Sequence, residues 1–209
     1  MKAKNKFKYL FASITICLAM FIGMVPMVTF AENDDAAEIN GTSYTTLTAA
    51  INAVPKNTST TIKMLKDVQE SITIGSEKDV ILNLNGHTLT LSGGTAQVIV
   101  KDEGKLEVKN GTITSNVSKK GAIDVSSGCV LKVSPGTTVS HTLGGSNGRQ
   151  AIFNKGGTVY ISNGATLTST ANDRATVHNL NDGDTNGTIT ITGGEITSNK
   201  NHAVYNEKA

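Results

Sequence analysis

Apolar and polar residues alternate in short runs along most of the chain after residue 79. Val, Ile, Leu and Thr fill these runs, and an alternation with a period of two predicts β-strands with one buried and one exposed face. Each run ends at a short turn, most often Asn-Gly or a similar pair. The pattern therefore predicts many short strands, none of which buries a face alone.

The strand–turn–strand unit recurs at a nearly constant spacing. Its turn glycines are Gly86, Gly111, Gly136, Gly164 and Gly194, so the period lengthens slightly toward the C-terminus. Self-similarity at about 20–50 residues indicates a solenoid in which each coil stacks on the next. Because the units are strands, we predict an all-β fold, a parallel β-helix.

A second repeat places asparagine at one corner of the coil. Asn154, Asn179 and Asn206 follow one another at almost the same period as the glycines. Stacked coils bring such side chains above one another, and each amide carries both donors and an acceptor. We therefore predict an asparagine ladder between successive coils.

Outward Thr-x-Thr pairs recur in several units and raise the hypothesis of ice binding by a flat threonine face. The pairs are Thr88/Thr90, Thr112/Thr114, Thr166/Thr168 and Thr188/Thr190. The period drifts along the chain, however, and this drift predicts mismatched registers. Threonine is also a common strand residue on a wet face.

Residues 44–78 predict an N-terminal cap followed by the first strands. Leu47, Ala50, Ile51 and Val54 follow the spacing of a short amphipathic helix that ends before Pro55. A helix over the end of a solenoid shields strand edges that otherwise pair with other chains.

The flanking segments complete the predicted organisation. We expect residues 32–43 to be a flexible N-terminal segment and residues 79–209 to hold the β-helix coils. The last coil begins at Ala203 and the chain stops in mid-repeat, so we expect an incomplete C-terminal end.

Composition sets residues 1–31 apart from the rest of the chain. Lysines precede an apolar stretch over residues 9–28, and Thr29-Phe30-Ala31 offers small residues at a cleavage site, so we predict a signal peptide over 1–31. An uncleaved anchor is the alternative, because the stretch approaches the roughly 20 residues that span a bilayer. The predicted location is extracellular, free or associated with the cell wall, without membrane contact after cleavage.

Charge and cysteine content narrow the function classes. The chain has 19 Lys+Arg and 17 Asp+Glu, but four of the lysines lie in the predicted signal peptide, which makes the remainder weakly acidic. This balance argues against a nucleic-acid partner held by bulk basicity. Cys129 is the only cysteine after the predicted signal peptide, so no disulfide partner is required, and its alternating strand predicts a small buried side chain.

Three segments carry a family resemblance: residues 44–54, residues 62–67 and residues 80–89. In this order they resemble the opening of pectate-lyase-like right-handed parallel β-helix domains of Gram-positive bacterial surface and adhesin-like proteins. The resemblance covers roughly residues 44–206. It implies a secreted or cell-surface module with a structural or adhesive role, non-catalytic, whose partner is a host or cell-surface glycan or protein.

The only cofactor that the sequence suggests is calcium. Asp182, Asp184 and Asn186 offer alternate oxygens and Gly187 takes the sixth position, as in the first half of a calcium loop. The twelfth position is Gly193 instead of the expected Glu. The competing interpretation is a polar turn whose Asp, Asn and Gly are common turn formers.

The alternative function is a polysaccharide-active enzyme, a lyase or glycosidase on the same scaffold. Arg149 and Arg174 precede two of the corner asparagines by the same distance, so they are candidate binding residues stacked one coil apart. Asp124, Asp173 and Asn201 are expected near this column. No local signature of a lyase or hydrolase surrounds these residues, and we name no catalytic residue.

Overall fold

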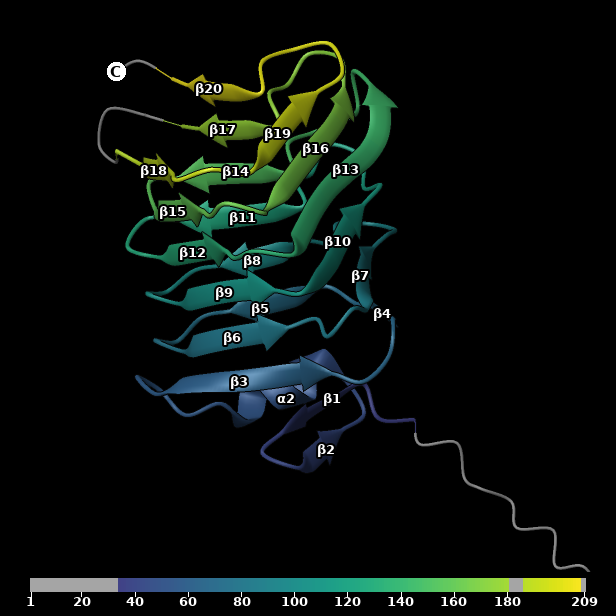
Figure 1. Cartoon of the computed structure of the whole chain (residues 1–209), viewed down its shortest axis with the longest axis vertical. Coiled ribbons are helices and arrows are strands. Elements are labelled where there is room, and N and C mark those ends of the chain that lie inside the picture. The colour runs from purple at the N-terminus through teal and green to yellow at the C-terminus, as the bar shows by residue number, and fades with distance from the viewer. Residues whose placement is uncertain (1–33, 181–185, 208–209) are drawn as a thin grey trace, which may run out of the picture. The chain divides into compact units, whose positions relative to one another are not determined.

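The computed structural model describes residues 34–180 and 186–207. Its strands form three sheets, and the chain passes through them in turn and returns one strand further along each sheet (Figure 1). The result is a parallel β-solenoid of about five turns. This confirms the predicted all-β parallel β-helix. The predicted signal peptide lies outside the described residues.

The three sheets are long ladders of very short strands. The first sheet has the order β18-β15-β12-β9-β6-β3-β1-β2, with β1 (Ala37–Ile39), β2 (Thr42–Tyr44), β3 (Ser59–Met64), β6 (Asp79–Asn83), β9 (Lys105–Lys109), β12 (Val130–Val133), β15 (Thr158–Ile161) and β18 (Thr188–Ile191). The second has the order β19-β16-β13-β10-β7-β4, with β4 (Val68–Gln69), β7 (Thr88–Leu91), β10 (Gly111–Ser115), β13 (Thr137–Gly145), β16 (Thr166–Ala171) and β19 (Glu195–Ser198). The third has the order β20-β17-β14-β11-β8-β5, with β5 (Ile72–Ile74), β8 (Val98–Val100), β11 (Ile123–Ser126), β14 (Ile152–Lys155), β17 (Val177–Asn179) and β20 (Val204–Asn206).

The core is a narrow column of inward-facing aliphatic side chains. Leu106, Leu131 and Val159 lie in register on successive strands of the first sheet and are almost fully buried. The same stacking holds in the other sheets, so one coil's apolar face is covered by its neighbours. A thin core of this kind needs few aromatic side chains, which accounts for the aromatic-poor composition.

The threonines of the second sheet form a regular array. Thr88, Thr112, Thr138 and Thr166 are direct partners on successive strands, and Glu195 follows them on β19. The changing length of the repeat is absorbed in the turns and in a register shift of β13 between His141 and Gly145, so the threonines stay in register. The sequence argument that a drifting period mismatches the registers was wrong. The pair Thr188/Thr190 lies on β18 of the first sheet.

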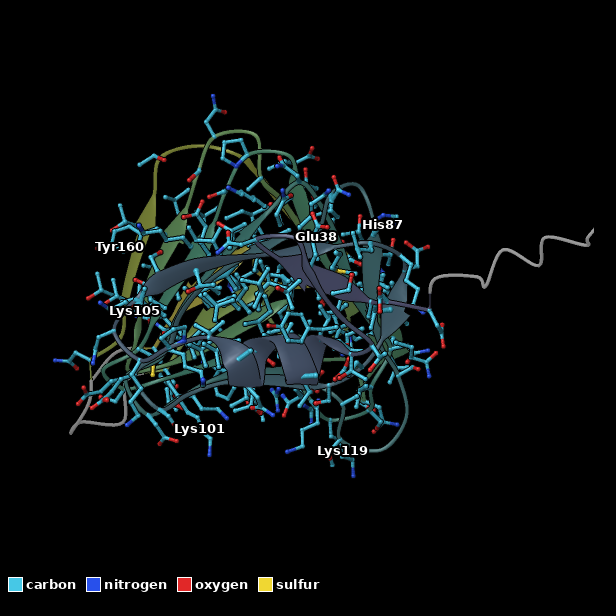
Figure 2. The ribbon with its side chains drawn as sticks, turned by 90° about the horizontal axis from the view of Figure 1, so that it is seen from below. Glu38, His87, Lys101, Lys105, Lys119 and Tyr160 are labelled. Atoms are coloured by element: carbon cyan, nitrogen blue, oxygen red, sulfur yellow. The ribbon has the colours of Figure 1, made fainter. Side chains whose placement is uncertain are left out.

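The N-terminal end is closed by a cap. Helix α2 (Leu47–Ala53) buries Leu47, Ala50 and Ile51, as the helical spacing predicted. Figure 2 views the molecule from this end, where α2 and β1 cross the mouth of the coil. α2 is the only helix in the described residues, and none there is long and apolar enough to cross a membrane.

The segment before the helix differs from the expectation of a flexible 32–43. Strand β1 pairs antiparallel with both β2 and β3, and Ala37 is fully buried. A turn with positive φ at Asn40 and Gly41 joins β1 and β2. The sequence did not predict β1 and β2 because each strand has only three residues. Pairing of β1 with β3 stabilises them.

The predicted asparagine ladder is present. Asn154 Nδ2 donates to Asn179 Oδ1 at 2.8 Å, and Asn179 Nδ2 donates to Asn206 Oδ1 at 2.7 Å. Gly187 runs so close to this ladder that a Cβ there would lie 2.3 Å from Asn179 Oδ1. The ladder therefore needs glycine in the adjoining turn.

Candidate ligand-binding site

The outer face of the third sheet carries the candidate site. Asp124, Phe153, His178 and Tyr205 are direct register partners on β11, β14, β17 and β20. Parallel strands lie about 4.8 Å apart, so side chains at one register position form a continuous column. One carboxylate is thus placed at the start of a row of three rings.

The rings of this column contact one another. The Phe153 and His178 ring centroids are 5.1 Å apart and tilted, and those of His178 and Tyr205 are 5.1 Å apart in an edge-to-face arrangement. Such geometries are the favourable ones for aromatic pairs. Phe153 is half-buried, whereas Tyr205 is exposed. Phe153 therefore packs within the column, whereas Tyr205 presents part of its ring to solvent. Tyr160 of β15, labelled in Figure 2, is also exposed.

A cavity of about 420 Å³ opens beside this column, and both Arg149 and Arg174 line it. The two arginines enter from the turns before β14 and β17, one coil apart. Asp124 lines the same cavity, whereas Asp173 and Asn201 line a neighbouring one that shares Arg174. The structure therefore brings together the residues that the spacing placed in one column.

The turn that carries Arg149 is held in place by hydrogen bonds. The guanidinium donates from Nη1 to the carbonyl oxygens of Ser146 (3.0 Å) and Gly148 (2.8 Å). Below it, the buried His141 Nε2 lies 3.1 and 3.0 Å from the carbonyl oxygens of Val117 and Lys120. Two carbonyl acceptors require a proton on Nε2, so His141 ties the 117–120 turn to β13.

Burial lowers the pKa of His141 below its ordinary value of 6.5, because the charged ring is poorly solvated there. The carbonyls of Val117 and Lys120 act in the opposite direction and stabilise the proton on the ring. His141 is therefore a structural, neutral histidine beneath the wall of the cavity.

The cavity carries an excess of positive charge. Lys119, Lys120 and Lys155 line it together with the two arginines, against Asp124 and Glu207. Lys155 Nζ lies 2.7 Å from Asp124 Oδ2 and 4.8 Å from the centroid of the Phe153 ring. This pair neutralises itself, which leaves four cationic groups against one carboxylate among the lining residues.

The remaining carboxylate, Glu207, belongs to a relay, a series of side-chain hydrogen bonds that spans three coils. The buried Gln150 Nε2 lies 3.1 Å from His178 Nδ1, and His178 Nε2 lies 3.4 Å from Glu207 Oε2. The amide donates to Nδ1, so the imidazole proton sits on Nε2 and faces Glu207. Burial lowers the pKa of His178, and the hydrogen bond to Glu207 partly opposes this shift. His178 is thus held neutral, with a fixed tautomer.

The spacing of the arginines in the sequence predicted the position of the site but not all of its residues. Phe153 and His178 lie next to the corner asparagines, and Gln150 comes directly before the buried Ala151. Their adjacency to a repeated corner position is the signal that marks them. Lys119 and Lys120 carried no such signal, because their turn is held at the site by hydrogen bonds between coils, from the Lys119 amide to the Asn147 carbonyl oxygen and between His141 Nε2 and the Lys120 carbonyl oxygen.

The calcium prediction falls largely outside the described residues, since it rests on Asp182 and Asp184. Asn186 is described and exposed. Within 34–180 and 186–207, no group of three or more His, Cys, Asp or Glu side chains is placed to hold a metal ion. The calcium loop stays a prediction. Cys129 is buried, as expected, and burial raises the pKa of its thiol.

Comparisons with known proteins add no identity to this geometry. No protein family, curated protein or solved structure matches the chain.

Proposed function

We propose that the chain is a secreted or cell-surface β-solenoid module with an adhesive role, which binds its partner without catalysis. The observation that carries this proposal is the cationic cavity beside the ring column of the third sheet. The family resemblance of residues 44–206 supports it, as does the export-like pattern of residues 1–31. The partner is a glycan or protein of a host or cell surface.

The state of the lining groups supports binding over catalysis. Asp124 is paired with Lys155, and Glu207 faces a histidine that is held neutral. Both arginines are anchored to backbone carbonyls of their own turns, Arg174 through Asp173 at 3.1 Å. Anchored guanidinium groups are fixed donors for an anion, and they have no proton to transfer at physiological pH.

The first experiment separates the binding module from the polysaccharide-active enzyme. The purified protein is incubated with acidic polysaccharides, and unsaturated or reducing ends are measured. We expect no release of sugar ends, together with saturable retention on a surface that carries the partner. Release that Arg174→Ala abolishes would overturn the non-catalytic role. Thermal melts with and without a chelator, with Asp184→Asn as control, test the calcium loop.

The threonine array favours a second candidate function, ice binding. Thr90, Thr114, Ser140 and Thr168 form a second file in register beside the first. Ser140 Oγ donates to Thr114 Oγ1 at 3.1 Å, so part of this file is already engaged within the protein. Thermal hysteresis measured for the protein and for Thr114→Lys tests this candidate, and equal values for both exclude the array.

A further inference from the structure

We propose that Asn163 is a site of spontaneous modification, at which the side-chain amide is lost and an isoaspartyl backbone forms that loosens the coil of β18 and β19. The proposal is independent of the binding role above. Asparagine followed by glycine is the most reactive pair for this chemistry, because glycine has no side chain to hinder the attack of its backbone nitrogen. Five such pairs lie wholly within residues 34–180, and they are Asn40-Gly41, Asn85-Gly86, Asn110-Gly111, Asn147-Gly148 and Asn163-Gly164.

The reaction needs a backbone amide that is free to attack the neighbouring side chain. The Gly164 nitrogen attacks Asn163 Cγ, so an N–Cγ bond forms and the Cγ–Nδ2 bond breaks. Nδ2 leaves as ammonia and takes the proton that the Gly164 amide gives up. Water then opens the resulting succinimide at either carbonyl, which leaves an aspartyl or an isoaspartyl residue with a new carboxylate. An amide that donates a hydrogen bond must break this bond before it can attack.

In the turns that lead from the first sheet to the second, most glycine amides are already engaged (Figure 1). The Gly86 nitrogen donates to the Asn110 carbonyl oxygen at 2.7 Å, and the Gly111 nitrogen donates to the Gly136 carbonyl oxygen at 3.0 Å. The Gly136 nitrogen continues the series and donates to the Gly164 carbonyl oxygen at 3.0 Å. Each turn is therefore hydrogen-bonded to the turn of the next coil.

The asparagine side chains of the protected turns are engaged as well. Asn85 Nδ2 donates to the Met64 carbonyl oxygen at 3.2 Å, and Asn110 Nδ2 donates to Asn83 Oδ1 at 3.3 Å. In the Asn-Gly pair at residues 147–148, the Gly148 amide is buried and hydrogen-bonded within its own turn. These three pairs must lose native hydrogen bonds before they can react.

The series of hydrogen bonds between turns stops at Gly164. Its nitrogen donates to no backbone carbonyl among the described residues, although its own carbonyl oxygen accepts from Gly136. Asn163 and Gly164 are both exposed, so water can reach the succinimide. Of the turns that join the first two sheets, this one combines the reactive pair with an unengaged amide.

The Asn163 turn is also packed closely beneath the turn of the next coil. A Cβ at Gly193 would lie 2.9 Å from Asn163 Cβ, and a Cβ at Gly194 would lie 2.7 Å from the Ala165 carbonyl oxygen. An isoaspartyl residue adds one methylene carbon to the backbone at this contact. The close packing leaves no room for this carbon unless the turn of the next coil moves.

The hairpin turn of the cap provides an internal comparison. Asn40 and Gly41 are exposed, and the Gly41 nitrogen also donates to no backbone carbonyl among the residues that the structure describes. A Cβ at Gly41 would have nothing within 4 Å. We expect Asn40 to react too, but without displacing a neighbouring coil.

Peptide mapping of the aged protein by mass spectrometry tests the site. The folded protein is kept at mildly alkaline pH in water that carries heavy oxygen, and electron-transfer fragmentation distinguishes isoaspartate from aspartate. We expect Asn163 to react at least about tenfold faster than Asn110, because the Asn110 turn must first lose two hydrogen bonds. In urea the two should react at similar rates, since both precede glycine. Similar rates in the folded protein, or an unchanged difference in urea, would overturn the proposal.

Hydrogen exchange tests the structural consequence. The amides of Thr192 and Glu195 donate to carbonyl oxygens of the preceding coil at 2.9 and 2.8 Å, so they report on the contact between these two coils. We expect both amides to exchange faster in the aged protein. Asn163→Gln, whose longer side chain cannot form the five-membered ring, should keep slow exchange after the same ageing, although Asn40 still reacts.

A second variant separates the new charge from the altered backbone. Freshly prepared Asn163→Asp carries the carboxylate on an ordinary backbone, so its Thr192 and Glu195 amides should exchange as in the unaged parent. Exchange as fast as in the aged parent would assign the effect to charge and overturn the role of the isoaspartyl backbone. Unchanged exchange in aged protein that contains isoaspartate at position 163 would overturn it as well.

Discussion

The two ends of the solenoid carry the same strand pattern but bury it differently. At the N-terminal end, α2 and the antiparallel strands β1 and β2 cover the first coil, and Ile62 and Met64 of β3 are fully buried. At the other end, β18, β19 and β20 are the last strands of their sheets. Among the described residues, Ile191 is 44% and Val204 37% exposed.

The comparison is sharpest between direct register partners. Ile161 pairs with Ile191, and Val177 pairs with Val204, yet Ile161 is 1% and Val177 0% exposed. The residue type and the position in the coil are the same in each pair. Burial in a solenoid is therefore supplied by the neighbouring coil and not by the strand's own sequence.

The largest expected loss of stability comes from the same isoleucine-to-alanine substitution at two paired positions, which tests whether the neighbouring coil supplies the burial. Ile161→Ala should lower the free energy of unfolding by about 2–5 kcal/mol, because it leaves a cavity in a packed core. Ile191→Ala should cost about 1 kcal/mol or less, since the side chain is already partly hydrated. Urea denaturation followed by circular dichroism measures both. Equal losses would show that the last coil is as well covered as the one before it.

The asparagine ladder offers a second matched pair. Asn154 is fully buried, donates to Asn179 and to the Gly157 carbonyl, and accepts from the Gly157 amide. Asn154→Ala leaves buried partners unpaired and should cost about 1–3 kcal/mol. Asn206→Ala, at the exposed end of the ladder, should cost less because water replaces it. Thermal melts of both variants measure the two losses of stability. A larger loss for Asn206→Ala would contradict the expectation that the buried end of the ladder contributes more.

The cap depends on the short helix α2. The backbone amides of its first turn donate hydrogen bonds to side chains that precede or lie outside the helix. Thr46 Oγ1 accepts from the Ala49 amide at 3.0 Å, and Glu70 accepts from the amides of Leu47 and Thr48, both at 2.9 Å. Thr46→Ala should lower the free energy of unfolding by about 1 kcal/mol. Thr45→Ala, one residue earlier and also exposed, is the control. Hydrogen exchange of the Ala49 amide should rise in Thr46→Ala alone.

The smallest expected effect is a change in the pH dependence of the melting temperature, which arises from histidines in the middle coils. The pKa of His141 is lowered in the folded state, so the unfolded chain binds more protons than the folded one below the ordinary value of 6.5. Stability from this group is therefore complete above pH 6.5 and is lost as the pH falls below it; His178 acts in the same direction. The melting temperature should fall less between about pH 7.5 and about pH 5.5 in His141→Gln than in the parent protein. An identical fall would exclude His141 as a contributor.

Much of the fold could be predicted from the sequence, because each stacked coil repeats the same pattern of residues. The alternation, the turn glycines and the corner asparagines each recur, so the coil, its core face and the ladder at Asn154 and Asn179 were predictable. The strands β1 and β2 were not, because they occur once and depend on pairing with β3. Of the site, the arginine column was predictable from equal spacing to the asparagines. Gln150, His178 and Glu207 form their relay only when three coils are stacked.

The sequence by itself determined which residues face inward, where each coil turns and that the N-terminal end carries a helix, since these follow from local alternation and turn chemistry. The tertiary structure decided which side chains meet across coils. Variable turns return each strand to the same register, so Asp124, Phe153 and His178 align although they are unequally spaced along the chain. Backbone hydrogen bonding between strands fixes that alignment, whereas the turn lengths in the sequence only permit it.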